Sequence, residues 1–240
     1  MSAVGQLKTV VWDAADIQGL ADFYVAVAGL TQHYADDEWV TLTSPDGWRF
    51  GVQRALDHVA PQWPDPAHPQ QMHVDFQVAD IDAAAELAEL HGATRLRDGE
   101  SWHVLADPAG HPFCLSRGQV ERPGVSGVIV DTGDPPALAR FYSGLLGLEV
   151  GYEGPDGVLL GREGQPRVMF QQVAQYQSPQ WPDPTRPQQL HLDVMIGADA
   201  DAAEEAALAL GATRLPGVGE NWRVYADPHG HPFCLLTPVG

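Results

Sequence analysis

The sequence is poor in basic residues and has no long hydrophobic run. Only 13 Lys and Arg stand against 32 Asp and Glu, which gives a formal charge of −19. Such a charge repels nucleic acid and anionic membrane surfaces, and no basic stripe suited to a phosphate backbone offsets it. No stretch is long and apolar enough to span a bilayer, and the first residues lack the apolar centre of a signal peptide. We therefore expect a cytoplasmic protein, a monomer or homodimer, that binds neither nucleic acid nor membranes.

Cysteine is also scarce. The two cysteines, Cys114 and Cys234, lie in the closely similar phrases DPAGHPFCL and DPHGHPFCL. Equivalent positions in two copies of a unit rarely meet, so we expect two reduced thiols and no disulfide. Each thiol is either a small buried apolar group or, if a histidine activates it, a nucleophile.

The two cysteine phrases belong to a duplication that covers the whole chain. PQWPDPAHPQQMHVD at 61–75 and PQWPDPTRPQQLHLD at 179–193 agree at 11 of 15 positions, and 99–115 agrees with 219–235 at 13 of 17. A period of this length is too long for a solenoid and suits a whole domain. We predict two tandem domains, residues 1–118 and 122–240, with the seam in a polar, Gly- and Pro-containing segment.

Each domain divides again into two modules of similar pattern. In the first module, the run LKTVVWDAAD precedes a helical pattern closed by Gly29, and three strand-like stretches follow. In the second module, QMHVDFQVAD is a strand, IDAAAELAELHG is a helix, and three more strands end in HPFCLS. The order of one strand, one helix and three strands therefore occurs four times, which predicts an α+β protein.

These features resemble a known superfamily. Four such modules, Phe-Tyr followed by Gly-Leu at the first helix, and a DPxG turn before the last strand resemble the vicinal oxygen chelate proteins, and PQQxHxD and GHPFCL resemble their glyoxalase-like domain members. This superfamily includes glyoxalase I, extradiol dioxygenases and bleomycin-resistance proteins. The resemblance implies four βαβββ modules that form two tandem glyoxalase-like domains. Each would be a curled mixed sheet with helices on its convex face and a ligand cup on its concave face.

Strand alternation indicates which side chains line a cup. In MHVDFQV the apolar residues share one face, which leaves His73 and Asp75 on the other, and LHLDVMI does the same for His191 and Asp193. The same reasoning adds four residues from neighbouring strands: Gln53, Cys114, Gln171 and Cys234. We expect each set to converge in its own domain: His73, Gln53 and Cys114 in the first, His191, Gln171 and Cys234 in the second.

The resemblance also implies where a metal would bind, because metal-dependent members take ligands from the first and last strands of each module. Those places hold Thr9, Gln53, His73 and Cys114 in the first domain, and Gly127, Gln171, His191 and Cys234 in the second. Gln and Thr are poor metal ligands, and one His with one Cys provides too few ligands for a typical zinc or iron site. We therefore expect no metal cofactor, with a divalent ion as the alternative.

The Pro-rich phrase falls between the two modules of each domain and predicts a stiff crossover. Within it, Trp63 and Trp181 either contact a ligand at the rim of the cup or pin the crossover to the sheet. His111 and His231 follow the DPxG turns, and we interpret them as turn residues.

Two functions fit this sequence. The first is a protein that binds a small organic molecule in a cup with apolar and aromatic walls. The alternative is a lyase, isomerase or dioxygenase of the same superfamily that uses His73 and His191 with a divalent metal or as acid–base groups. The sequence assigns no catalytic residue, and it leaves open whether one cup or both are functional.

Overall fold

Four modules of one strand, one helix and three strands follow one another along the chain. The computed structural model describes residues 3–65, 68–162, 164–183 and 188–238, so Pro66 and part of the second Pro-rich crossover lie outside the described residues. Within these segments the elements are β1 (Gly5–Ala14), α1 (Ile17–Ala28), β2 (Thr31–Ala35), β3 (Trp39–Thr43), β4 (Arg49–Arg54); β5 (Met72–Val78), α2 (Ile81–Leu90), β6 (Thr94–Asp98), β7 (Trp102–Ala106), β8 (Pro112–Arg117); β9 (Gly124–Thr132), α3 (Pro135–Leu146), β10 (Val150–Gly154), β11 (Gly157–Leu160), β12 (Val168–Gln172); and β13 (Leu190–Ile196), α4 (Ala200–Leu210), β14 (Thr213–Val218), β15 (Trp222–Ala226), β16 (Pro232–Leu236). The α+β fold of four βαβββ modules is confirmed.

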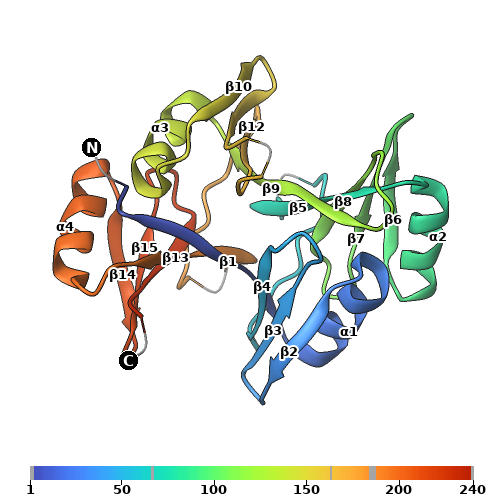
Figure 1. Cartoon of the computed structure of the whole chain (residues 1–240), viewed down its shortest axis with the longest axis horizontal. Coiled ribbons are helices and arrows are strands. Elements are labelled where there is room, and N and C mark those ends of the chain that lie inside the picture. Colours follow the sequence, from blue (N-terminus) through green and yellow to red (C-terminus); the bar gives the residue numbers. More distant parts are fainter. Residues whose placement is uncertain (1–2, 66–67, 163, 184–187, 239–240) are drawn as a thin grey trace.

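The strands form two eight-stranded mixed sheets, each built from strands of both halves of the chain (Figure 1). Sheet A has the order β14-β15-β16-β13-β1-β4-β3-β2, and sheet B has the order β10-β11-β12-β9-β5-β8-β7-β6. At their centres, β1 pairs antiparallel with β13 and β5 pairs antiparallel with β9. We call the concave faces of these sheets cup A and cup B. Each cup combines the first module of one half with the second module of the other.

The hydrophobic core of each half of the chain lies between its own two modules, and this explains the exchange. Tyr24 of α1 stacks on Trp12 of β1 with 4.2 Å between ring centroids, and it lies 5.9 Å from Phe76 of β5. Phe23 meets Phe113 of β8 edge-on at 5.8 Å. Because the apolar faces of the two modules pack together, their polar faces point in opposite directions. Two modules of one half therefore cannot share a cup.

The helices begin and end where the local sequence directs. Asp16 accepts a hydrogen bond from the main-chain N–H of Gly19 at the start of α1, and Gly29 ends that helix in the left-handed region with φ of 64°. The predicted helix end is thus confirmed. None of the helices in the described segments is long and apolar enough to cross a membrane.

A buried Tyr–Asp–His group ties each DPxG turn to a helix. Tyr24 donates its hydroxyl hydrogen to Asp107 Oδ2 at 2.8 Å, and the same oxygen lies 3.0 Å from His111 Nδ1. The other carboxylate oxygen accepts from the main-chain N–H groups of Ala109 and His111. Asp107 is therefore satisfied on both oxygens although it is buried, as a buried charge requires.

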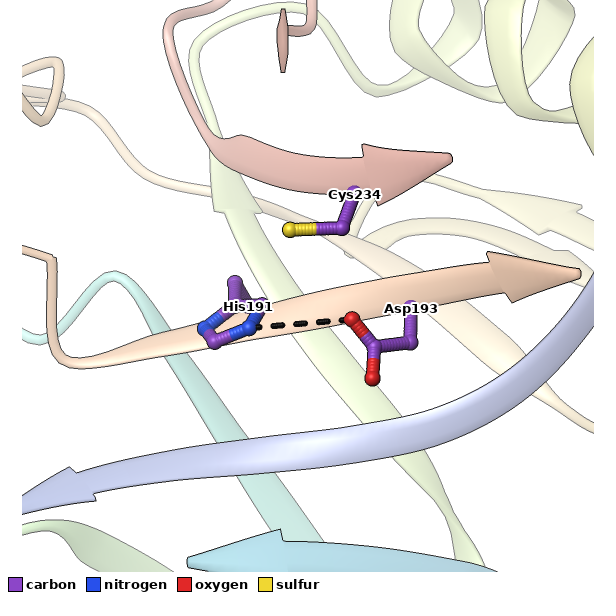
Figure 2. A group of neighbouring side chains, drawn as sticks. All are labelled: His191, Asp193 and Cys234. Atoms are coloured by element: carbon purple, nitrogen blue, oxygen red, sulfur yellow. Dashed lines mark ion pairs between the residues drawn. The ribbon is translucent and has the colours of Figure 1, made fainter. Parts of the chain in front are cut away.

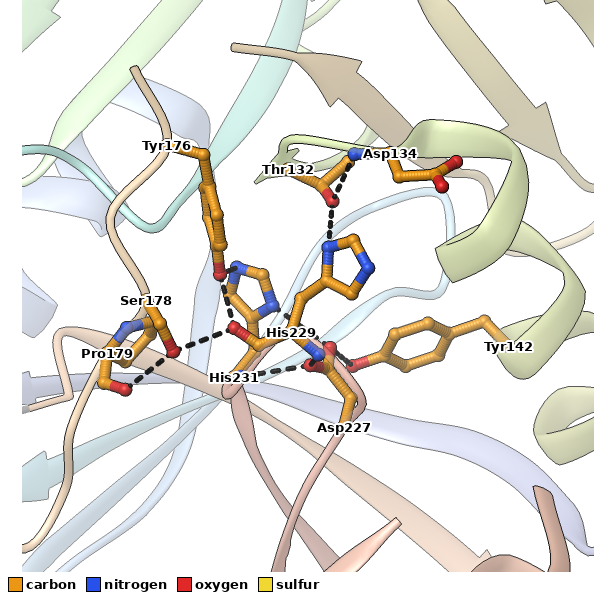
Figure 3. Close-up of polar contacts among 9 residues, drawn as sticks. All are labelled: Thr132, Asp134, Tyr142, Tyr176, Ser178, Pro179, Asp227, His229 and His231. Atoms are coloured by element: carbon orange, nitrogen blue, oxygen red, sulfur yellow. Dashed lines mark hydrogen bonds and ion pairs between the residues drawn. The ribbon is translucent and has the colours of Figure 1, made fainter. Parts of the chain in front are cut away.

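The second half of the chain repeats this group around Asp227, with 3.1 Å to the hydroxyl of Tyr142 and 2.9 Å to His231 Nδ1 (Figure 3). Tyr176 adds a hydrogen bond to the carbonyl oxygen of His229 at 2.6 Å, and its hydroxyl lies 3.2 Å from His231 Nε2. His111 and His231 thus hold the turn, in agreement with their interpretation as turn residues.

The second glutamine of each PQQ phrase joins the two halves of the chain. The main-chain N–H of Gln71 donates to Gln189 Oε1 at 3.1 Å, and that of Gln189 donates to Gln71 Oε1 at 3.2 Å. The carbonyl oxygens of the same two residues accept from the N–H groups of Asp131 and Asp13 at 3.0 Å. The repeated phrase therefore binds its own second copy across the centre of the molecule.

We predict that Tyr24→Phe lowers the free energy of unfolding by about 1–3 kcal/mol, because it leaves the buried carboxylate of Asp107 without one hydrogen bond. Tyr34→Phe is the matched control, since the exposed Tyr34 hydroxyl donates to Asp36 at 2.6 Å in solvent and its loss costs less than about 0.5 kcal/mol. Urea unfolding of both variants measures the difference. Equal losses in the two variants would contradict the proposed role of the buried group.

Stability should also depend on pH through His111. Burial lowers the pKa of His111, but the carboxylate of Asp107 outweighs burial, so that the pKa lies above its ordinary value of 6.5. A raised folded-state pKa contributes stability that is present in full below about pH 6.5 and is lost as the pH rises through the folded-state value. Urea midpoints measured across this range should fall for the natural chain. They should fall less for His111→Asn, whereas the exposed-site variant His91→Asn should behave like the natural chain.

Candidate functional site

A cavity of about 550 Å³ opens in cup A. Its walls are mainly aromatic and aliphatic, and its floor is polar. The walls carry three tryptophans, Trp39, Trp181 and Trp222. The polar groups that line it are Glu38, Gln53, Arg54, Gln188, His191, Asp193, Asn221 and Cys234.

His191 of β13 lies at the centre of the floor, between two carboxylates. Its Nδ1 is 3.7 Å from Asp13 Oδ1, and its Nε2 is 3.7 Å from Asp193 Oδ1. The side-chain nitrogen of Gln188 lies 3.3 Å from the same Nδ1. These four residues are buried, and Asp13 Oδ1 accepts no hydrogen bond from any described residue. Asp13 does not line the cavity, so its carboxylate acts on the floor through His191.

The surroundings of His191 favour its protonated form. Burial lowers its pKa, but the neighbouring Asp13 and Cys234 raise the pKa well above 6.5. Burial raises the pKa of Asp193, and the charge of His191 offsets this only in part. The geometry of the floor therefore favours a protonated imidazole at His191.

Cup B contains the same residue types at the equivalent positions. Gln70 and Gln171 donate to the two oxygens of Asp131 at 3.0 and 3.4 Å, and His73 Nε2 lies 3.4 Å from Asp75 Oδ1. Burial lowers the pKa of His73, whereas Asp75 and Asp131 raise it above 6.5. Burial and the charge of Asp75 raise the pKa of the Cys114 thiol far above its ordinary value, so that thiol is not an activated nucleophile.

The expected grouping of the site residues is wrong in one respect. Gln53 lines cup A with His191 and Cys234, and Gln171 contacts Asp131 in cup B with His73. The two glutamines thus lie in opposite cups from those predicted. The physical reason is the packing of apolar faces within each half of the chain, which turns Gln53 away from His73.

Several residues near the floors and walls were missed from the sequence: Asp13, Asp131, Gln70, Gln188, Trp39 and Trp222. A signal for the two aspartates is present, because each stands one residue before the end of the first strand of its half, at the same 118-residue spacing that relates the two histidines. Gln70 and Gln188 are the first glutamines of the PQQ phrases, which the sequence pattern marks only as part of a crossover. Trp181, for which two roles were open, lines the cavity.

Two of the tryptophans lie flat on glycines. The Trp39 ring covers Gly51 of β4, and the Trp222 ring covers Gly219 in the turn before β15, so that neither glycine has room for a Cβ atom. A hydrogen bond from Trp39 Nε1 to Thr41 at 2.9 Å holds the first ring further. The walls of cup A are therefore fixed aromatic surfaces, because rings packed on backbone have few alternative rotamers.

Three side chains in cup A could provide donor atoms for the metal that the superfamily resemblance implies. The ligand atoms of His191, Asp193 and Cys234 all lie within 4.8 Å of one another (Figure 2). In the described part of the chain this is the one such group of three. Nitrogen, carboxylate oxygen and sulfur are zinc ligands, and three of them leave an open position. The residues thus fit a divalent ion, which would supply a Lewis acid, provided that His191 releases its proton.

Without a metal, the floor can carry out proton transfer. A protonated His191 can donate to an oxygen that reaches the floor, and Asp193, which also lines the cavity, can accept from a donor there. Both groups face the same small volume, because they stand two residues apart on β13. Orientation of a polar ligand and acid–base chemistry both need this arrangement.

Comparison with solved structures supports the fold. Glyoxalase I from Zea mays shows 16% identity and a TM-score of 0.63, with 97% of this chain and 92% of that chain covered. A putative dioxygenase from Bacillus subtilis shows 14% identity and a TM-score of 0.62, with 100% and 87% covered. Identities this low establish the shared fold alone.

Comparison with sequences gives the family. No curated protein matches this sequence significantly. The family model described as the glyoxalase-like domain matches residues 9–116 and, a second time, residues 127–236. These two matches cover nearly the whole chain, and the chain therefore belongs to the glyoxalase-like domain family, with two copies of the domain in tandem.

Proposed function

We propose that this protein binds a small organic molecule in cup A. The observation that carries the proposal is the cavity of about 550 Å³, walled by three tryptophans above a buried polar floor. Ligand sites in proteins typically combine this size with apolar walls and a few fixed polar groups. The tryptophans supply contact area, and the floor selects a ligand with a polar end.

The floor orients the ligand through His191. The imidazole is held between Asp13 and Asp193, so its direction is set before a ligand arrives. A ligand carbonyl or hydroxyl oxygen at the floor accepts its proton in a charge-assisted hydrogen bond. Such a preorganised donor favours binding because little ordering remains to be done.

A lyase or isomerase is the second candidate function, and the buried proton on the floor favours it. The raised pKa of His191 makes the imidazole a proton donor at neutral pH, with Asp13 close enough to reorient it. Proton exchange between solvent and a carbon of the bound ligand distinguishes this candidate from plain binding. His191→Gln should abolish the exchange, whereas His73→Gln in cup B should leave it intact.

Binding is testable with N-phenyl-1-naphthylamine, a neutral aromatic probe that fluoresces in apolar cavities. We expect about one site per chain. Trp222→Ala should weaken binding at least about tenfold, as the loss of a central aromatic contact does. Trp102→Ala, at the equivalent position of cup B, is the matched control and should change affinity little. No saturable binding, or equal loss in both variants, would refute cup A as the site.

The metal content of the purified protein is the next prediction. We expect well under one zinc, iron, nickel or manganese per chain by elemental analysis when no metal is added, because a metal must displace the proton of His191. Added Co²⁺ should give no intense sulfur-to-metal charge-transfer band. A stoichiometric metal whose band disappears in Cys234→Ala but persists in Cys114→Ala would contradict this and would identify the group in Figure 2 as a metal centre.

A further inference from the structure

The two cups differ on one edge strand, which is β6 in cup B and β14 in cup A. Each of these strands pairs with the strand that carries the equivalent tryptophan, Trp102 on β7 and Trp222 on β15. In cup B, Arg97 of β6 extends its guanidinium over the Trp102 ring, 5.9 Å from the ring centroid. Arg97 pairs with Val104, and Val104 pairs with Cys114, so these side chains share the concave face. A residue of the protein itself thus covers this aromatic surface.

Cup A has glycine at the corresponding position. Val218 pairs with Arg223 as Asp98 pairs with His103, which places Gly217 of β14 at the position of Arg97. A Cβ atom on Gly217 would lie 3.0 Å from Val224 Cγ2, 3.4 Å from the Trp181 ring and 3.5 Å from the Trp222 ring. Gly217 lines the cavity beside both tryptophans, and it has no side chain that could extend over them as Arg97 extends over Trp102.

Exposure of the tryptophans agrees with this difference. Trp222 lines the cavity and is exposed, with 40% of its surface accessible to solvent. Trp102, which lies beneath Arg97, has a smaller exposed fraction and is half-buried. Both rings pack on the glycine three residues before them, Gly219 for Trp222 and Gly99 for Trp102. The face that is covered in cup B is available in cup A.

We propose that cup A binds a planar organic cation, of the guanidinium or protonated arylamine class, on the open face of Trp222. The guanidinium of Arg97 on the Trp102 ring in cup B shows how a planar cation can lie on the equivalent Trp222 ring, because the two cups derive from the same repeated unit. This inference rests on cup A being the ligand site. Gly217 then admits the ligand, and Arg97 excludes the same ligand from cup B.

The charges around cup A suit a cation at the rim. Glu38 lines the cavity, and the chain as a whole carries a formal charge of −19. Arg54 is the opposing charge, but its Nη1 donates to the carbonyl oxygen of Asp37 at 3.1 Å. His191 is balanced at the floor by its two carboxylate neighbours. A ring face with nearby carboxylates is the usual setting for cation–π binding.

Benzylguanidinium and benzylurea test the charge, because the two probes have nearly the same shape and only the first is a cation. We expect calorimetry to show one benzylguanidinium site per chain, with about tenfold preference over benzylurea, which corresponds to a cation–π contact of about 1.4 kcal/mol. Equal affinities would overturn the inference and leave the proposed function intact. Binding of neither probe, while N-phenyl-1-naphthylamine still binds, would likewise overturn the inference alone.

Reciprocal substitutions test the position. Gly217→Arg should abolish benzylguanidinium binding in cup A. Gly217→Ala is its control, because it has the same unfavourable φ of 114° without the guanidinium and should retain most of the affinity. Arg97→Ala should uncover Trp102 and add a second, weaker site per chain. Unchanged binding in Gly217→Arg, with circular dichroism showing a folded chain, would overturn the proposal, as would a stoichiometry of one in Arg97→Ala.

Discussion

The arrangement of the whole molecule depends on the burial of two apolar sheet faces around a shared helix within each half of the chain, α1 in the first half and α3 in the second. Trp12 and Phe50 of one module and Phe76 and Phe113 of the other are all fully or nearly fully buried around Tyr24. Burial of each such ring is worth about 1.5–3 kcal/mol, so that the four rings together favour this packing strongly. Once these faces meet, the polar faces must point outward in opposite directions.

The two sites follow from this constraint. Each outward face is half a cup, and it is completed by strand pairing with the other half of the chain through β1 and β13 or β5 and β9. The reciprocal hydrogen bonds of Gln71 and Gln189 fix the point at which the halves cross. Neither cup can form from one copy of the domain alone, which gives the duplication a structural consequence beyond doubled length.

The floors of the cups have stayed alike while their rims have diverged, and burial accounts for the difference. His191 and its carboxylate neighbours are buried, so that loss of one partner would leave another unpaired charge in the interior, at a cost of several kcal/mol. Arg97 and Gly217 are exposed to solvent and carry no such penalty. Gly217 of cup A stands where cup B has Arg97, and Trp39 stands where cup B has the buried Gly157. The proposed selectivity between the cups rests on these positions.

The sequence by itself determined the modules and the facing of their side chains. The 118-residue repeat can be read directly from the sequence. The Gly29 helix end and the alternation around His73 and His191 are local patterns, and the structure follows them. Only the tertiary structure decided that Gln53 joins His191 and not His73. That choice depends on which apolar faces pack together, and strand alternation is identical for both outcomes. The aromatic walls of the cavity were equally hidden from sequence, because Trp39, Trp181 and Trp222 come from three separate segments that only the fold brings together.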